Sequence, residues 1–422
     1  MFSFRTTPLD RQEDLVLRRG NLAVLCNQSA WDPERQEYLF GELYRSGRLR
    51  KVFYPADGLF GEILPDGHAM PSEQPMPSDQ PMQAGQSMQA VPPLSLQPGA
   101  GKVDYGDAFG MAGCRFVPLQ SGPDGESSLD PSVLEDVDAL IVEYQDTGSR
   151  YDSMTAVLYD VFQMIHLGDL PVSVYILDRE NICGRQVEGT PLCPGSSVAA
   201  GLEGIPHRHG LTLGELANLF YSELGARFPL HIISFMVRPA TQYLMPWSIP
   251  PRPDVPGLFT SGFYCGMVLL SGTDLSWGEG TARPYEFIGA PYLKDWMRDC
   301  DPETVSDAGV FLRRTVFTPR FGRWAGQACY GMQLLPRPGI PYHSVAHALR
   351  ILRAMVSDGV QVDVSMLPDV IGDEILYGYV GGSVAWEDMK EHIKVEEQKW
   401  IRKARRYMLY DDQLSRVKTI KL

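Results

Sequence analysis

The residues best suited to chemistry follow an apolar run in the first half of the chain. Residues 139–142 form this run, and Gln145, Asp146 and Arg150 come directly after it. Continuous apolar runs are typical of buried strands in parallel sheets, and open α/β sheets bind ligands beyond the carboxyl ends of such strands. The stretch predicts either one wall of a site or a strand end followed by a solvated turn.

Two other apolar runs end in the same way. Asn27 and Gln28 follow the run that begins at residue 21, and Asp178 and Arg179 lie at the end of the run 172–177. Carboxyl ends of parallel strands share one edge of a sheet, so these side chains are expected to converge with the first group. A structural ion pair between Asp178 and Arg179 is the alternative.

Several loop residues are weaker candidates. Glu188 and Glu279 lie in glycine-flanked loops, where a carboxylate can be presented to a ligand or simply be solvated. His209 precedes a predicted helix that begins with a capping box of Thr212 and Glu215. A hydrogen-bonded structural histidine is the commoner role for such a residue.

The motifs of several other protein classes are absent from the sequence. There is no G-x-G-x-x-G, no phosphate-binding G-x-x-x-x-G-K-[ST] and no G-x-S-x-G. His343 and His347 are four residues apart but lack the H-E-x-x-H glutamate, and the seven cysteines form no C-x-x-C pair. The sequence therefore predicts no nucleotide cofactor and no metal.

The pattern of elements predicts how these residues are positioned. Apolar runs alternate with segments of helical periodicity up to about residue 235, which is typical of a doubly wound, mostly parallel α/β sheet. Proline-rich residues 246–256 then lead to a smaller mixed unit. We therefore expect an α/β domain over 1–255 and a second α/β domain over 256–422. Residues 69–98, rich in Pro, Gln and Met, predict a disordered insertion in the first domain.

Composition limits the partners. The 422 residues carry a formal net charge of −14 and no basic stripe, which argues against nucleic acid. No apolar run is long enough to span a membrane, the N-terminus does not resemble a signal peptide, and the unpatterned cysteines favour a reducing compartment. A cytoplasmic protein is expected, with no prediction of its oligomeric state.

Taken together, several blocks resemble one family. They are Leu-Cys-Asn-Gln-Ser (25–29), Gln-Asp-Thr-Gly-Ser-Arg (145–150), Leu-Asp-Arg (177–179), Val-Glu-Gly (187–189), the block 208–216, the block 272–284 and Phe-Thr-Pro (317–319). In this order they resemble the exo-β-N-acetylmuramidase (NamZ-like) glycoside hydrolases. The resemblance implies a Rossmann-like domain, a smaller α/β domain and a cleft between them. It also implies release of N-acetylmuramic acid from the non-reducing end of peptidoglycan fragments, without metal or nucleotide.

One turn departs from the family pattern. The family usually carries Pro-Glu-His-Gly after its second strand, and its glutamate is the leading candidate for the catalytic acid/base. Here the turn is Pro55-Ala56-Asp57-Gly58, and alanine cannot transfer a proton. Asp57 and Glu62 are the candidate substitutes. A catalytically inactive relative that binds a muropeptide or amino sugar as a sensor or scaffold is the alternative, and an unrelated α/β enzyme is a third.

The resemblance and the residue patterns together define the predicted site. The expected catalytic residues are Asp57, Asp146 and Glu188. The expected substrate-binding residues are Asn27, Gln28, Gln145, Arg150, Asp178, Arg179, His209, Glu279 and Arg283. The lactyl carboxylate of N-acetylmuramic acid is a suitable partner for an arginine side chain, and Arg150 or Arg283 is expected to pair with it.

Overall fold

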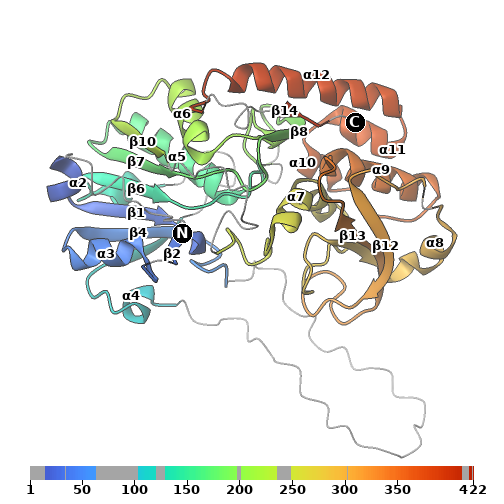
Figure 1. The fold of residues 1–422 in the computed structure, drawn as a ribbon, viewed down its shortest axis with the longest axis horizontal. Helices are drawn as coiled ribbons and strands as arrows, with labels where there is room; N and C mark the ends of the chain where they lie inside the picture. The colour runs from blue at the N-terminus through green and yellow to red at the C-terminus, as the bar shows by residue number, and fades with distance from the viewer. Residues whose placement is uncertain are drawn as a thin grey trace, which may run out of the picture.

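A computed structural model of the chain shows two lobes, with the N-terminal half on the left of Figure 1. The structure describes residues 15–33, 35–62, 103–119, 129–196, 201–234, 249–301, 303–410, 418–420 and 422. The insertion predicted at 69–98 lies outside these residues.

A six-stranded parallel sheet forms the centre of the N-terminal lobe, in the order β10-β7-β6-β1-β4-β5. Its strands are β1 (Leu22–Cys26), β4 (Leu49–Pro55), β5 (Arg115–Leu119), β6 (Ala139–Glu143), β7 (Ser173–Asp178) and β10 (Leu230–Ser234). The predicted fold class, a doubly wound parallel α/β sheet, is confirmed. The edge strand β5 was not predicted, because its half-exposed Arg-Phe-Val-Pro-Leu sequence lacks a continuous apolar run.

Helices cover both faces of this sheet, which explains why strands β1, β6 and β7 are buried at every position. Along β1, Ala23 and Leu25 pack into the core beneath α5 (Ser153–Leu167) and α6 (Leu213–Glu223). The alternate residues Leu22 and Val24 pack into the opposite core. That core includes residues of α2 (Leu15–Arg19), α3 (Leu39–Arg45) and α4 (Tyr105–Ala108). Short elements complete the lobe: η1 (Gln28–Ala30), β2 (Trp31–Asp32), β3 (Glu37–Tyr38) and η2 (Pro131–Leu134).

The C-terminal lobe is built on a three-stranded antiparallel sheet, ordered β11-β13-β12. The strands are β11 (Phe287–Ala290), β12 (Val310–Phe317) and β13 (Cys329–Pro336). The helices around its core are α7 (Leu258–Met267), η4 (Val268–Gly272), η5 (Pro291–Leu293), α8 (Lys294–Asp299), α9 (Ser344–Ser357), α10 (Leu367–Ile371) and α11 (Glu374–Gly381).

Two elements join the lobes. Helix α12 (Trp386–Ala404) runs along the top of both lobes in Figure 1. Its residues Met389 and Ile393 lie in the C-terminal core, whereas Trp400 and Ala404 lie in the N-terminal core. A small sheet of β8 (Gln186–Pro191), β9 (Pro206–Arg208) and β14 (Lys418–Thr419) lies beside it. The end of the chain thus packs on both lobes, and the division predicted at residue 255 stays a prediction.

Candidate functional site

A hollow lies at the carboxyl edge of the central sheet, where open α/β sheets bind their ligands. We call it the strand-end hollow. It measures about 330 Å³, including the solvent at its mouth. It is lined by Asn27, Pro55, Asp57, Gly58, Leu59, Gly61, Asp152, Ser153, Met154, Pro251, Arg252 and Pro253. These residues follow strands β1 and β4, begin helix α5, and belong to the connection between the lobes.

The turn after β4 presents Asp57 to the strand-end hollow. The Gly58 amide closes the turn on the Pro55 carbonyl at 2.9 Å. Gly58 has a φ of 100°, which residues with a side chain rarely adopt. Ala56 is exposed and does not line the hollow, whereas the Asp57 side chain is 33% exposed and does.

The electrostatic surroundings of Asp57 favour its protonated form. Burial raises the pKa of the Asp57 carboxyl, and the guanidinium of Arg252, with Nη2 3.9 Å from Oδ2, opposes that rise without cancelling it. A carboxyl with a raised pKa is suited to donate a proton.

A second carboxyl, Asp152, also lines the hollow. It is buried and caps helix α5, with Oδ1 accepting from the Met154 amide at 2.9 Å. Its Oδ2 accepts from the Thr147 amide at 2.8 Å. Burial raises the pKa of Asp152, and the charge of Asp146 raises it further. Sequence reasoning missed Asp152, although an aspartate before a predicted helix is a recognisable cap signal.

Asn27 and Gln28 hold the wall of the hollow. The Asn27 Nδ2 donates to the carbonyls of Gln145 at 3.0 Å and Pro251 at 3.3 Å. The Gln28 Nε2 donates to the Pro250 carbonyl at 2.9 Å. Both amides therefore tie the connection at 250–251 to the end of β1.

Gln145, Asp146 and His209 form a buried group next to this wall. The Gln145 Nε2 donates to the Glu180 carbonyl at 3.0 Å, and Asp146 Oδ2 accepts from the Gly148 amide at 3.2 Å. His209 Nε2 lies 3.3 Å from the same oxygen of Asp146. None of the three lines the strand-end hollow.

Asp178 and Arg179 lie at the same edge of the sheet, but their side chains bind different partners. Asp178 accepts from Thr212 Oγ1 at 2.8 Å and from the Gly214 amide at 2.7 Å, which fixes the start of α6. Burial raises its pKa to about 6, although these hydrogen bonds oppose the rise. The Arg179 guanidinium binds the Ser29 carbonyl at 2.8 Å and Glu143 Oε1 at 3.2 Å.

Arg150 lies between the lobes. Its guanidinium donates to the carbonyl of Thr190 at 2.9 Å in the small sheet and to that of Ile371 at 2.5 Å in the C-terminal lobe. The side chain is buried and does not line the hollow.

Glu188 is the centre of a buried network between the lobes. Its Oε1 accepts from Arg208 Nη1 at 2.6 Å, and its Oε2 accepts from Ser344 Oγ at 2.6 Å and the Val345 amide at 3.2 Å. The carboxylate thus caps α9 from the other lobe. Its catalytic role stays a prediction, and its contacts show a structural one.

Glu279 and Arg283 belong to a loop of the C-terminal lobe. Arg283 Nη1 pairs with Glu286 Oε2 at 3.0 Å, and its side chain is 59% exposed. Glu279 is half-buried against Gly322. Neither residue lines the strand-end hollow.

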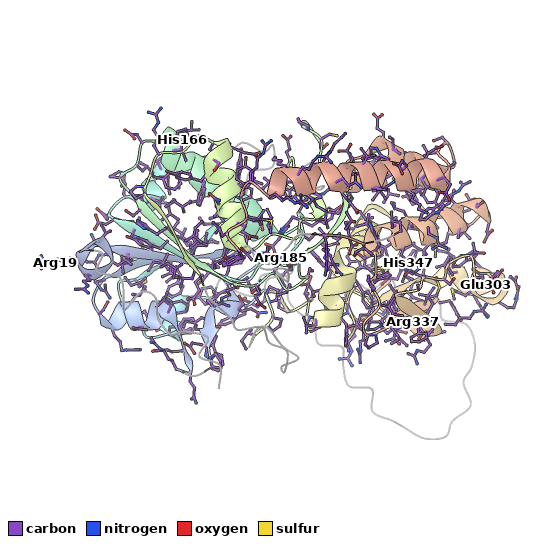
Figure 2. The ribbon with its side chains drawn as sticks, turned by 45° about the horizontal axis from the view of Figure 1, so that its top comes forward. Arg19, His166, Arg185, Glu303, Arg337 and His347 are labelled. Carbon is purple, nitrogen blue, oxygen red and sulfur yellow. The ribbon has the colours of Figure 1, made fainter. Side chains whose placement is uncertain are left out.

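His343 and His347 have separate partners. His347 lies inside the C-terminal lobe (Figure 2), with Nε2 2.7 Å from the Val305 carbonyl and Nδ1 2.8 Å from Tyr342 Oη. His343 caps α9 and binds Glu397 through Nε2 at 2.9 Å. Throughout the part of the chain that the structure describes, no group of three His, Cys, Asp or Glu residues is arranged to hold a metal ion.

The pair of His343 and Glu397 makes stability depend on pH. Burial alone would lower the pKa of His343, but Glu397 and Glu188 outweigh it and raise the pKa. Burial raises the pKa of Glu397, and His343 opposes the rise. Both folded-state pKa values lie above the unfolded ones, so this contribution to stability is complete at low pH. It is lost as pH rises through the folded-state pKa values.

We therefore expect His343→Gln to flatten the decline in the free energy of unfolding above about pH 6.5, the ordinary histidine pKa. Urea unfolding at several pH values measures this decline. The matched control is His392→Gln, because His392 makes a 2.9 Å contact with Asp373, and this histidine is more exposed than His343. Glu397, Glu188, Arg208 and His207 are the charged or titratable groups that act on His343. Parallel curves for wild type and His343→Gln would contradict the expectation.

Known crystal structures share the fold of this chain. Two crystal structures of DUF1343 family proteins from Bacteroides fragilis superpose on the chain with TM-scores of 0.66 and 0.65, at 19% and 18% identity. The alignments cover 93% and 94% of this chain, and 94% and 96% of the two proteins. No helix among the described residues is long and apolar enough to cross a membrane.

Family models identify the chain more closely. The N-terminal model of the exo-β-N-acetylmuramidase NamZ matches residues 123–258, and its C-terminal model matches residues 262–410. The peptidoglycan β-N-acetylmuramidase NamZ of Bacillus subtilis is 30% identical over 243 residues, which are 57% of this chain and 58% of that protein. The chain belongs to the NamZ family, as its sequence blocks predicted. The turn at 55–58 lies before the matched residues.

Proposed function

We propose that this chain is a glycoside hydrolase that releases N-acetylmuramic acid from the non-reducing end of peptidoglycan fragments. The family relationship supports the class of reaction. The observation that carries the proposal for this chain is Asp57, a half-buried carboxyl with a raised pKa at the wall of the strand-end hollow.

The proposed reaction needs two carboxyls, one to protonate the leaving oxygen and one to assist the nucleophile. In this proposal Asp57 gives its proton to the glycosidic oxygen as the bond from that oxygen to the anomeric carbon breaks. Asp152, which lines the same hollow, takes a proton from the water whose oxygen bonds to the anomeric carbon. Its raised pKa makes the Asp152 carboxylate, once ionised, a stronger base for this proton. Asp146 assists through its charge, which acts on Asp152.

The test is incubation of the protein with a chromogenic β-N-acetylmuramide, and we expect release of the chromophore. N-acetylmuramic acid itself should raise the melting temperature, because a ligand that binds only the folded state stabilises it. Absence of both effects would contradict the proposal.

Ala56 favours the second candidate function, a binding protein without turnover. Its side chain has no proton that it can transfer, and it lies exposed beside Asp57. A raised melting temperature without chromophore release would support this candidate. Turnover gained by Ala56→Glu would then show that the missing glutamate is the cause.

A further inference from the structure

The strand-end hollow contains an arginine that the sequence analysis did not select. Arg252 lines the hollow, and its side chain is 30% exposed. The arginines predicted to hold a ligand carboxylate lie elsewhere, with Arg150 on backbone carbonyls between the lobes and Arg283 on Glu286. The sequence did not identify Arg252, because this residue lies in a proline-rich stretch that predicts only an extended connection between two domains.

The guanidinium of Arg252 is held in a fixed orientation. Asp254 accepts from its Nε at 2.9 Å and from its Nη2 at 3.2 Å. Tyr285, which is buried in the C-terminal core, donates its hydroxyl to Asp254 Oδ2 at 3.1 Å. Contacts within the described residues include no hydrogen bond from Arg252 Nη1. One edge of the guanidinium is thus anchored on Asp254, and Nη2 also lies 3.9 Å from Asp57 Oδ2. Among the described residues, Nη1 is left to bind a ligand at the hollow.

We propose that Arg252 binds the carboxylate of an anionic sugar, so that the strand-end hollow selects a carboxylate-bearing N-acetylhexosamine over a neutral one. The inference rests on the proposed function. It assigns recognition of the substrate's negative charge to one residue, Arg252. A guanidinium presents parallel N–H donors that match the two oxygens of a carboxylate. The orientation imposed by Asp254 and Tyr285 reduces the entropy lost on binding.

Binding at Arg252 also affects the proton on Asp57. In the free protein the positive charge of Arg252 favours the ionised form of Asp57. A ligand carboxylate on the guanidinium adds a negative charge near Asp57, and a like charge favours the protonated form. The bound sugar would thereby help to keep the proposed acid protonated.

The experiment compares two ligands that differ only in charge: N-acetylmuramic acid and the same sugar with its lactyl carboxyl converted to the carboxamide. Dissociation constants are measured by calorimetry on the full chain, so the readout does not depend on turnover. Charged hydrogen bonds contribute enough to stability that their loss weakens binding by roughly 10–100-fold. We therefore expect wild type to prefer the acid by this factor and Arg252→Gln to bind both sugars alike.

Three variants separate recognition from folding. Arg252→Lys keeps the charge but loses the paired donors, so its preference for the acid should be intermediate. Arg298→Gln removes an exposed arginine outside the hollow and should bind as wild type does. Arg283→Gln tests the other arginine that the sequence predicted as the partner of the carboxylate. Each variant's melting temperature reports whether it folds.

The outcomes distinguish this inference from the proposed function. If wild type binds neither sugar and hydrolyses no β-N-acetylmuramide, the proposed function fails, and the ligand assigned to Arg252 fails with it. If wild type binds both sugars equally, or if Arg252→Gln weakens both equally, only the role of Arg252 is wrong. Loss of the preference in Arg283→Gln rather than in Arg252→Gln would also overturn it.

Discussion

Asp57→Asn lowers kcat for a chromogenic β-N-acetylmuramide by about 10²–10⁴-fold, the range in which general acid catalysis contributes. Asparagine keeps the size and polarity of the side chain but has no transferable proton. The turn that Gly58 closes on Pro55 does not involve the carboxyl, so the fold is expected to be unchanged. Steady-state kinetics with purified wild type and variant measure the effect.

Glu62→Gln is the matched control for this prediction. Glu62 follows the same turn, but its carboxylate accepts hydrogen bonds from the Phe60 amide and the Tyr105 hydroxyl and does not line the hollow. A loss in Glu62→Gln with normal activity in Asp57→Asn would transfer the role of the acid to Glu62. The pH profile gives a second check. Burial raises the pKa of Asp57, so wild-type activity should persist above the ordinary aspartate pKa and fall as pH rises through the raised value.

Arg208→Met is expected to destabilise the protein by about 3–5 kcal/mol, the usual cost of removing one partner from a buried ion pair. Glu188 would remain buried, with one carboxylate oxygen left without its cation. Arg208 Nη2 also donates to Gln186 Oε1 at 2.9 Å, so a second contact is lost. Urea unfolding followed by circular dichroism measures the free energy of unfolding.

Arg298→Met provides the comparison for an arginine at the surface. Arg298 pairs with Asp299 at 2.7 Å, but both side chains are well exposed. Surface pairs of this kind contribute little, so no measurable change is expected. Adding Glu188→Gln to Arg208→Met should restore part of the loss, because the unpaired charge is then gone. Equal stability of the Arg208 and Arg298 variants would mean that the network between the lobes is not a source of stability.

The central sheet was predictable because its strands are buried on both faces. Apolar runs identified β1, β4, β6, β7 and β10, and the polar residues after β1, β6 and β7 predicted the edge that carries the strand-end hollow. The half-exposed strand β5 gave no such signal.

The individual site residues were harder to predict than the edge. Gln145 and Asp178 have the residue types of a binding site, but the protein's own backbone groups take up their hydrogen-bonding capacity. Sequence alone does not show which polar side chains are consumed in this way. Arg252 is the opposite case, a residue that lines the hollow without a sequence signal. Its orientation depends on contacts with Asp254 and, through Asp254, with Tyr285 of the C-terminal lobe.

Helix α12 has a consequence for how the chain folds. Met389 and Ile393 complete one core, and Trp400 and Ala404 complete the other, so neither core is closed until this late segment is in place. The Trp400 indole also donates to the His209 carbonyl at 2.9 Å, far back in the chain. Such contacts have a large sequence separation and form slowly. During synthesis, therefore, we expect the first half of the chain to expose apolar surface until residues 386–404 have been made. We also expect the unfolding of the two lobes to be coupled through this helix.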